Sequence, residues 1–436
     1  MIEGFASDDP YVRTADAVLR MLFADHYARN FSVELWDGSR VPSTGASKFT
    51  LKINSPGALR LALRPPVDLN AGRALAANLL DCEGDLEAAM HTLYQSINAF
   101  RRSSALKLYS LLLRLPRARL PKLREARLRG KLHSVERDQA AIGFHYDQPV
   151  AFYRSFLGEQ LVYSCAYFDD GVDTLEEAQT AKIDYVLRKL RLLPQERLLD
   201  IGCGWGTLVL RAAKAFNARV VGVTLSRSQY EEGNRRIREA GLQDRASIEL
   251  RDYRQLKLQS FDKIASIGMF EHVGRPNLPE YFNRAFELLR PGGLFLNHGI
   301  AEQNPGRPGG RVTGFMERFI FPDGELVAIG DALQIAEHNG FEVRDVENLR
   351  EHYTRTLRCW IRNLQANKEH AISCTDEQTY RAWRLYMAGS AQGFAIGRLG
   401  VFQSVLVKPH SDGRVDLPPT RRNLYTTERP SSARYK

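Results

Sequence analysis

The sequence predicts an α/β fold with a mainly parallel sheet, preceded by a small N-terminal α+β domain. Three observations lead to this prediction. Residues 142–410 alternate short β-branched runs with amphipathic helical stretches, which is typical of an open parallel sheet with helices on both faces. Residues 1–100 contain helical and alternating segments of their own. The chain of 436 residues also exceeds the length of one typical domain.

The N-terminal domain is predicted from its changes of hydrophobic period. Residues 11–29 carry apolar side chains at helical spacing. Residues 31–64 change to alternating apolar and polar side chains, with a turn at Asp37–Gly38. After Pro65–Pro66, helical spacing returns and continues to about residue 98. The segment is therefore expected to be a compact unit of mixed structure.

Residues 101–141 are predicted to be a basic connector. Lys and Arg are dense from Arg101 to Lys131, where Glu125 is the one acidic residue. Leucines are interleaved with these cations and two prolines interrupt them, as in an amphipathic basic surface. The net charge of +10 favours a polyanion, and the absence of an RNA-binding signature favours a lipid surface over nucleic acid. A solvated linker is the plainer alternative.

The domain from 142 to 410 takes its predicted strands from short apolar runs. In chain order they are LLDIG, ARVVGVT, ASIEL, DKIASIG, GGLFLNHG, FEVRDVENL and VFQSVLV. Residues 411–436 are rich in Pro, Arg, Ser and Thr and are expected to form a flexible tail.

Three features of the sequence bear on where in the cell the protein is expected: its cysteines, its N-terminus and its hydropathy. Five scattered cysteines form no C-x-x-C pair, which indicates reduced thiols in a cytoplasm and no zinc site. The start, MIEGFASDDP, lacks the basic and apolar regions of a secretory signal. No apolar run approaches the roughly 20 residues that span a bilayer. We therefore expect a cytoplasmic protein that is at most peripheral to a membrane.

The strongest motif is LDIGCGWGT at 199–207, between a predicted strand and a predicted helix. Gly202, Gly204 and Gly206 let the backbone turn tightly and approach a ligand, while the helix N-terminus presents free N–H groups. The G-x-G-x-G spacing differs from the G-x-G-x-x-G of dinucleotide sites, and Asp200 suits the amino group of a methionine moiety. The motif favours S-adenosylmethionine (SAM) over NAD.

The next two strands carry candidate groups for the rest of the cofactor. Thr224 ends the second strand, where many nucleotide sites have an acidic residue for the ribose. Thr224, Ser226 and Gln229 offer hydroxyl and amide groups instead. Asp252 and Tyr253 end the third strand, where adenine is expected, although they could equally cap a turn.

Five motifs occur in a specific order: YSCAYF at 163–168, TLEEAQTAKIDYVLRKL at 174–190, LDIGCGWG, VVGVTLS, and SIGMFEHVG at 266–274. Together they resemble the cyclopropane fatty acid synthase and mycolic acid cyclopropane synthase family over about residues 142–408. The resemblance implies a class I, Rossmann-like SAM methyltransferase. Residues 31–98 resemble the N-terminal domain of the bacterial phospholipid enzymes, which the mycolic acid enzymes lack. This implies a phospholipid substrate, and lipid docking or dimerisation for that domain.

The resemblance also implies the roles of individual residues. Contact with SAM is implied for Tyr163, Ser164, Gly202, Gly204, Thr224, Leu225, Gln229, Asp252 and Tyr253. A bicarbonate ion beside the reacting methyl group is implied to be held by Cys165, Glu271, His298, Ile300 and Tyr353. Ser390 departs from the family pattern, because several relatives have a cysteine there. A thiol at that position is therefore not expected to be essential.

The implied reaction moves the SAM methyl carbon to a double bond of an unsaturated phospholipid at the inner face of the membrane. The alkene becomes a carbocation, which must be kept from water and nucleophiles until a base removes a proton and a cyclopropane ring closes. His298 and Tyr353 can donate to a bicarbonate base, and Glu271 can accept from it. Aromatic walls that stabilise a cation are expected from Phe168, Phe270, Tyr281, Phe315, Phe319 and Phe321.

Plainer interpretations stay open for these residues. Cys165 and the aromatic residues could be core side chains, His298 a buried histidine with ordinary partners, and Glu271 with His272 a helix cap. A metal is disfavoured because no H-x-x-x-H or H-E-x-x-H spacing occurs.

Other functions also stay open. They are a methyl-branched or methylene fatty acid synthase, a non-catalytic SAM- or lipid-binding protein, and a methyltransferase of small amines. The acyl chain, the head group and the oligomeric state are left undetermined, with a homodimer as the working expectation.

Overall fold

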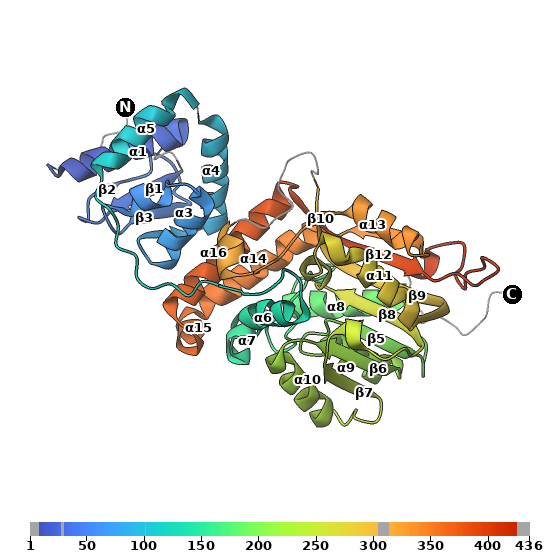
Figure 1. Ribbon diagram of the computed structural model, residues 1–436. Helices are drawn as coiled ribbons and strands as arrows, with labels where there is room; N and C mark the ends of the chain where they lie inside the picture. Colours follow the sequence, from blue (N-terminus) through green and yellow to red (C-terminus); the bar gives the residue numbers. More distant parts are fainter. Residues whose placement is uncertain (1–7, 28–29, 101, 304–313, 425–436) are drawn as a thin grey trace. The chain divides into compact units, whose positions relative to one another are not determined.

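The structure is a computed structural model that describes residues 8–27, 30–100, 102–303 and 314–424. It divides into two compact units (Figure 1). Unit 1 comprises Met1–Ala126, Thr313–Ile320 and Lys368–Gln392, and unit 2 comprises Arg127–Val312, Phe321–Asn367 and Gly393–Lys436. Unit 1 therefore extends beyond the 100 residues assigned to it from sequence, and it includes two segments from much later in the chain.

Unit 1 contains a four-stranded sheet with helices packed against it. Its strands are β1 (Phe31–Leu35), β2 (Arg40–Val41), β3 (Phe49–Ile53) and β4 (Leu80–Gly84). Its helices are α1 (Pro10–Phe23), α2 (Ala58–Ala62), α3 (Val67–Ala76), α4 (Leu86–Ala99), α5 (Ala105–Arg114), α12 (Gly314–Phe319), α15 (Lys368–Cys374) and α16 (Glu377–Ala395). The sheet order is β2-β1-β3-β4, in which β1 and β3 are parallel and the other pairs are antiparallel.

Strand β4 was not anticipated from the sequence, which predicted continuous helical structure up to about residue 98. Its residues, LDCEG, include two acidic side chains and no β-branched residue, so local propensity does not indicate a strand. Pairing with β3, with Leu51 opposite Cys82, defines it instead. The tertiary context therefore decides its conformation.

The late segments are packed into unit 1 by specific contacts. The ring of Phe315 on α12 lies so close to Gly72 on α3 that no side chain would fit there. Arg384 on α16 donates to Asp81 Oδ1 at 3.0 Å and to the Cys82 carbonyl at 2.6 Å, both on β4. Chain segments separated by about 240–300 residues therefore form one core.

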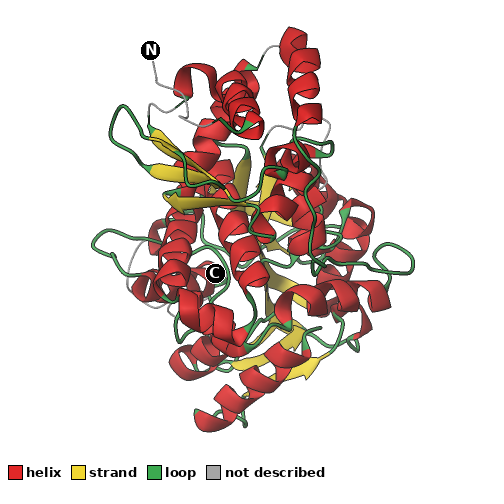
Figure 2. Cartoon of the chain, turned by 90° about the vertical axis from the view of Figure 1, so that its left-hand side faces the viewer, coloured by secondary structure: helices red, strands yellow, loops and turns green. Residues whose placement is uncertain are grey.

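Unit 2 contains the large sheet. Its strands are β5 (Arg197–Ile201), β6 (Arg219–Thr224), β7 (Ala246–Leu250), β8 (Phe261–Ile267), β9 (Leu289–Glu302), β10 (Val327–Ala328), β11 (Glu342–Asn348) and β12 (Leu399–Val407). Its helices are α6 (Val135–Tyr146), α7 (Val150–Leu157), α8 (Leu175–Lys189), α9 (Thr207–Phe216), α10 (Arg227–Glu239), α11 (Leu278–Leu288), α13 (Ile329–His338) and α14 (Arg350–Ala366). In Figure 2 the strands of both units lie among helices.

The order of the large sheet is β11-β12-β9-β8-β5-β6-β7, with β10 paired to β9. The strands from β5 to β9 run parallel, while β12 is antiparallel to both β9 and β11. Buried clusters on Leu198 and Val209, and on Leu199 and Phe282, cover the two faces. These pairings confirm the predicted α/β fold and its mainly parallel sheet, and each of the seven predicted strands is present.

Helix α8 shows how local sequence sets an element in place. The Thr174 side chain accepts from the Glu177 amide, and the Glu177 side chain accepts from the Thr174 amide, so both hydrogen bonds of the capping box are present.

Residues 425–436 of the predicted tail lie outside the described residues. Within the described part of the chain, no helix combines the length and the apolar character needed to cross a bilayer.

Candidate active site

The loop between β5 and α9 turns sharply at its glycines. Gly202, Gly204 and Gly206 have φ angles of +76°, +54° and +81°, which side chains strongly disfavour. The amides of Gly202 and Cys203 both donate to the Val223 carbonyl at 3.0 Å. The loop is thereby fixed against β6 at the carboxyl edge of the parallel strands, where such folds bind ligands.

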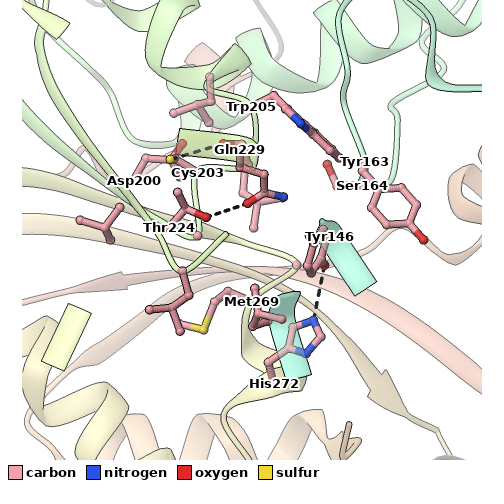
Figure 3. Close-up of a pocket in the computed structure, with 18 of the residues that line it drawn as sticks. Tyr146, Tyr163, Ser164, Asp200, Cys203, Trp205, Thr224, Gln229, Met269 and His272 are labelled. Carbon is pink, nitrogen blue, oxygen red and sulfur yellow. Dashed lines mark hydrogen bonds between the residues drawn. The ribbon is translucent and has the colours of Figure 1, made fainter. Parts of the chain in front are cut away.

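A cavity lies beside this loop, lined also by residues of α6 and α8 (Figure 3). Ten of the eleven predicted cofactor residues line it: Tyr163, Ser164, Asp200, Gly202, Gly204, Thr224, Leu225, Gln229, Asp252 and Tyr253.

Gly206, the eleventh predicted cofactor residue, is not among the residues that line the cavity. An added Cβ there would lie 2.7 Å from Ile248 Cδ1, so the position is occupied by packing at the start of α9. Glycine is needed at Gly206 for this close approach and for its left-handed conformation.

One end of the cavity combines a buried acid with a buried base. Asp200 is the penultimate residue of β5, and burial raises the pKa of its carboxyl to about 7. Lys182 on α8 is also buried, and burial lowers the pKa of its ammonium to about 8. Lys182 Nζ donates to Ser164 Oγ at 2.8 Å. A carboxylate and an ammonium so arranged complement the ammonium and carboxylate of an amino acid.

The polar groups after β6 are partly committed to one another. Thr224 Oγ1 donates to Gln229 Oε1 at 2.7 Å, and the amide nitrogen of Gln229 points into the cavity (Figure 3). Ser226 is fully buried, caps α10 by accepting from the Gln229 amide, and donates to Asp147 Oδ1 at 2.6 Å. Ser226 therefore holds the loop, whereas Thr224 and Gln229 face the ligand space.

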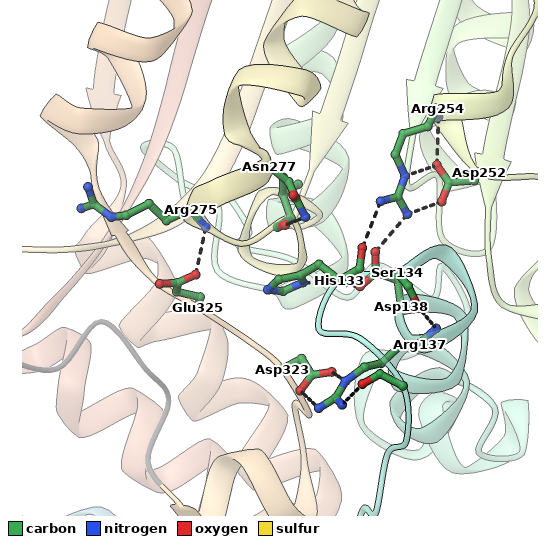
Figure 4. Close-up of polar contacts among 12 residues, drawn as sticks. His133, Ser134, Arg137, Asp138, Asp252, Arg254, Arg275, Asn277, Asp323 and Glu325 are labelled. Carbon is green, nitrogen blue, oxygen red and sulfur yellow. Dashed lines mark hydrogen bonds and ion pairs between the residues drawn. The ribbon is translucent and has the colours of Figure 1, made fainter.

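Helix α6 is held beside the cavity by ion pairs (Figure 4). Arg254 Nη2 lies 2.6 Å from Asp252 Oδ2 and 2.9 Å from Asp138 Oδ2, so it joins the end of β7 to α6. Arg137 donates through Nε to Asp323 Oδ2 at 2.6 Å and through Nη2 to Asp323 Oδ1 at 2.8 Å. Asp252 is thus bound to Arg254, and both Asp252 and its neighbour Tyr253 line the cavity.

The predicted catalytic residues Glu271 and Ile300 meet directly. The Ile300 amide donates to Glu271 Oε1 at 2.6 Å, which fixes this oxygen of the carboxylate. The implied role of Ile300 in holding an ion stays a prediction. Glu271 Oε2 is buried without a hydrogen-bond partner. Burial raises the pKa of the Glu271 carboxyl to about 7.

His298 lies on β9, two residues before Ile300, and its side chain is on the same face of the strand. Its Nδ1 is 3.1 Å from Nε2 of Gln403 on β12, while its Nε2 is buried without a partner. Burial, with the charges of Lys182 and Lys189, holds the pKa of the imidazole well below its usual range. His298 is therefore neutral, and the charge of Lys182 acts on it as well as on Asp200.

Cys165 and Tyr353 share one partner, the Leu349 carbonyl, next to the start of α14. The Cys165 thiol lies 3.7 Å from the Leu349 carbonyl, which also accepts from the Tyr353 amide at 3.0 Å. Burial raises the pKa of the Cys165 thiol above its usual value. Cys165 is therefore a neutral thiol, which lacks the strong nucleophilicity of a thiolate.

A family model described as mycolic acid cyclopropane synthetase matches residues 133–404. The chain belongs to this family. A probable fatty acid methyltransferase of Pseudomonas putida is 38% identical over 396 residues, which are 90% of this chain and 95% of the relative. Cyclopropane mycolic acid synthase 1 of Mycobacterium tuberculosis is also 38% identical, over 61% of this chain and 95% of that protein.

Solved structures of the family agree with the fold. Mycolic acid cyclopropane synthase CmaA1, complexed with SAH and CTAB, has 37% sequence identity and a TM-score of 0.59, and covers 62% of this chain and 98% of its own. Coclaurine N-methyltransferase, at 21% identity and a TM-score of 0.60, shares the fold alone. This member of the mycolic acid cyclopropane synthetase family is a SAM-dependent methyltransferase with the class I fold and a small N-terminal domain.

The six aromatic residues expected as walls around a substrate cation lie outside the lining of the cofactor cavity, and their role at the substrate stays a prediction. Phe270 and Tyr281 belong to the buried cluster of unit 2, and Phe315 and Phe319 stack on each other in unit 1. Phe168 packs on Ala178 and Cys359. Phe321 is the nearest to the prediction, with its ring centroid 4.2 Å from that of His145.

Aromatic residues outside that predicted set lie at the cofactor cavity. Tyr146, Tyr163 and Trp205 line the cavity. The Tyr163 ring lies 5.1 Å from that of Trp360, which lies 6.0 Å from that of Tyr353. A continuous row of rings therefore leads from the cofactor cavity to the predicted catalytic tyrosine.

Several residues of the site could not be identified from single motifs. Lys182 stands in TLEEAQTAKIDYVLRKL among the buried positions Gln179, Ile183 and Val186, and this helical spacing is the signal that would have found it. His272 follows Glu271 and lies 3.4 Å from the Tyr146 hydroxyl, and burial lowers the pKa of its imidazole to about 4. Ser390, which replaces the family cysteine, lies half-buried on α16.

Proposed function

We propose that this enzyme transfers the SAM methyl carbon to the double bond of an unsaturated phospholipid acyl chain and closes a cyclopropane ring. The observation that carries the proposal is a pair of buried polar atoms without partners, Glu271 Oε2 and His298 Nε2. Such atoms are costly in a folded protein unless a ligand satisfies them. An acceptor on Glu271 and a donor on His298 are the kinds of group that would bind a small anion carrying a hydroxyl group.

A phospholipid substrate is supported by the extent of the matches. The fatty acid methyltransferase of Pseudomonas putida matches 90% of this chain, so the match includes most of unit 1. Cyclopropane mycolic acid synthase 1 matches only 61%. The presence of unit 1 therefore groups this chain with relatives that are named for fatty acids and not for mycolic acids.

The chemistry requires a dry, unreactive site. The π electrons of the alkene attack the sulfonium methyl, the C–S bond breaks, and S-adenosylhomocysteine leaves. The adjacent carbon becomes a cation, and loss of a proton from the new methyl group closes the ring. The aromatic row from Tyr163 to Tyr353 presents π faces that stabilise such a cation, and burial keeps the Cys165 thiol from ionising to the more nucleophilic thiolate.

Bicarbonate, which the family resemblance implies, would supply the base that accepts this proton. The residues fit such an ion: neutral His298 has Nε2 available as a donor, and Glu271 Oε2 is available as an acceptor. The Gln403 amide next to Nδ1 positions the imidazole, and the Ile300 amide fixes the other Glu271 oxygen. Glu271 must be ionised to accept a hydrogen bond in this arrangement.

A methyl-branched or methylene product is the second candidate, because the curated relatives of nearly full length are named only fatty acid methyltransferases. It differs in which proton is lost from the same cation.

We also propose that the enzyme works at the cytoplasmic face of the membrane as a peripheral protein.

The test is incubation of the protein with SAM and vesicles of unsaturated phospholipid, followed by mass spectrometry and NMR of the acyl chains. We expect the gain of one CH₂ per double bond and the NMR signals of a cyclopropane ring. Branched or methylene signals would replace the first candidate by the second. Unchanged acyl chains, from protein that binds SAM in calorimetry, would refute both.

A further inference from the structure

Helix α5 has an inner apolar stripe that holds it in unit 1. Leu112 is 7% exposed, and Leu115, directly after the helix, is 1% exposed. The helix lies along α1 and also contacts α2, both in unit 1 (Figure 1). This stripe accounts for the position of α5 as that of an ordinary amphipathic helix.

A second apolar stripe on α5 faces solvent. Leu106, Tyr109 and Leu113 are 84%, 62% and 51% exposed. They are spaced three and four residues apart and therefore lie on one side of the helix. A helix surface that faces water is normally polar, so three large apolar side chains in a row indicate a surface that is covered in use.

Cations without acidic neighbours in the sequence surround this stripe. Residues 105–124 contain no Asp or Glu. Five of their Lys and Arg side chains are exposed and have no ion-pair partner within the described ranges: Lys107, Arg114, Arg117, Arg119 and Lys122. The next acidic residue, Glu125, is already bound to Arg73 through two hydrogen bonds of 2.7 and 2.8 Å.

The chain after α5 has no regular structure, yet contacts within unit 1 fix its course. Arg60 Nη1 donates to the Leu115 carbonyl at 2.7 Å. Gly57 lies against the backbone of Ala118 so closely that a side chain would not fit. The Arg124 amide donates to Gln378 Oε1 at 3.1 Å. The cations of this segment are therefore held next to α5 while their side chains stay exposed.

We propose that the outer stripe of α5 and the basic segment 114–124 form a docking surface for an anionic lipid bilayer. Leu106, Tyr109 and Leu113 enter the boundary between headgroups and acyl chains, and the cations bind lipid phosphates. Amphipathic helices with basic flanks bind membranes in this way. A second copy of the chain is a poorer occupant, because two such basic surfaces would repel each other. The inference rests on the proposed lipid substrate.

The test is flotation of the full-length protein with vesicles of saturated phosphatidylglycerol and phosphatidylcholine, which hold no double bond and so report binding alone. We expect wild-type binding to require phosphatidylglycerol and to weaken as salt is raised. The triple variant Leu106→Ser, Tyr109→Ser, Leu113→Ser is expected to bind at least 10-fold more weakly at any salt concentration. Arg117→Glu with Arg119→Glu is expected to remove the dependence on phosphatidylglycerol.

Matched controls come from unit 2. Leu258 is 71% exposed, and its neighbour Lys257 is exposed as well. Leu258→Ser and Lys257→Glu make the same chemical changes in unit 2 and should leave vesicle binding unchanged. Unchanged thermal melting and SAM affinity show that each variant is folded.

Activity on unsaturated phospholipid dispersed in detergent micelles separates the two proposals. Variants that lose vesicle binding but keep micelle activity support the docking surface. A triple variant that binds vesicles like the wild type overturns it. If that variant also changes from a dimer to a monomer, the stripe is instead a contact between two copies of the chain. A wild-type protein that is inactive on both lipid forms counts against the proposed function, while the saturated vesicles still test docking.

Discussion

The Glu271 carboxyl is a buried acid whose pKa is raised to about 7 by desolvation, so its charge depends on pH in the neutral range. Because the proposed chemistry needs the ionised form as an acceptor, turnover should fall as the pH drops below about 7. Glu271→Gln should lower kcat by about 10²-fold or more at pH 8 and leave the SAM dissociation constant nearly unchanged. Equal losses in both quantities would contradict the role, and calorimetry beside the acyl-chain assay measures them.

The same raised pKa affects stability with a defined sign. Between the usual value of 4.5 and about 7, the folded protein keeps a proton that the unfolded chain has lost. As the pH rises through this window, the free energy of unfolding should therefore fall by up to about 1.4 kcal/mol per pH unit. Glu271→Gln should remove this slope, so the variant gains on the wild type from pH 5 to pH 8 in urea titrations. Parallel profiles for the two proteins would show that Glu271 titrates normally.

Gln403 is predicted to be a positioning residue for His298. Its amide lies 3.1 Å from Nδ1, which leaves Nε2 to carry the proton that the anion needs. Gln403→Glu places a carboxylate there, which should draw the proton to Nδ1 and lower turnover more than Gln403→Leu does. Nitrogen NMR of His298 should show Nδ1 protonated in the glutamate variant, with SAM affinity retained.

A matched control for that prediction exists in unit 1. Gln392 Nε2 lies 2.9 Å from His91 Nδ1, so the same kind of pair occurs in unit 1. Gln392→Glu should leave turnover unchanged. A loss equal to that of Gln403→Glu would indicate that a general loss of stability explains both.

At the scale of elements, α6 is a wall of the cofactor cavity that is tied down near its start. Asp138 and Tyr146 line the cavity, and Arg137 pairs with Asp323 through two hydrogen bonds. Arg137→Ala should loosen this wall and raise the SAM dissociation constant about 10-fold, measured by calorimetry. Arg211→Ala breaks a similar two-bond pair with Asp184 outside the cavity lining and should have no such effect. Equal SAM affinities in the two variants would contradict the prediction.

The sequence was sufficient where local pattern and tertiary structure agree. The runs that became β5 and β6 are rich in branched apolar residues and end at the glycine loop and at Thr224, so strands and cofactor residues were both predictable. Strand β4 was not, because its polar residues become a strand only by pairing with β3. Lys182 was missed because a lysine on a helix is normally exposed, and its burial depends on Ser164 from another segment.

At the scale of the whole molecule, unit 1 is discontinuous, which no motif could reveal, because Gly72 and Phe315 have no local signature of their contact. A fragment of residues 127–436 would retain α12 and α16 without their partners. Exposing Phe315 and Phe319 alone should cost about 1.5–3 kcal/mol each. The fragment should therefore melt at a lower temperature than the full chain and bind a hydrophobic dye. An unchanged melting temperature would contradict this.

The burial of thiols gives the protein a natural chemical handle. Four of the five cysteines are buried, and Cys374 on α15 is partly accessible. A maleimide dye added to the native enzyme should therefore attach at one defined position in unit 1, and further labelling would appear only as the fold opens. The rate at which further dye attaches then measures how fast the buried cysteines become exposed by opening of the fold, without any engineered residue.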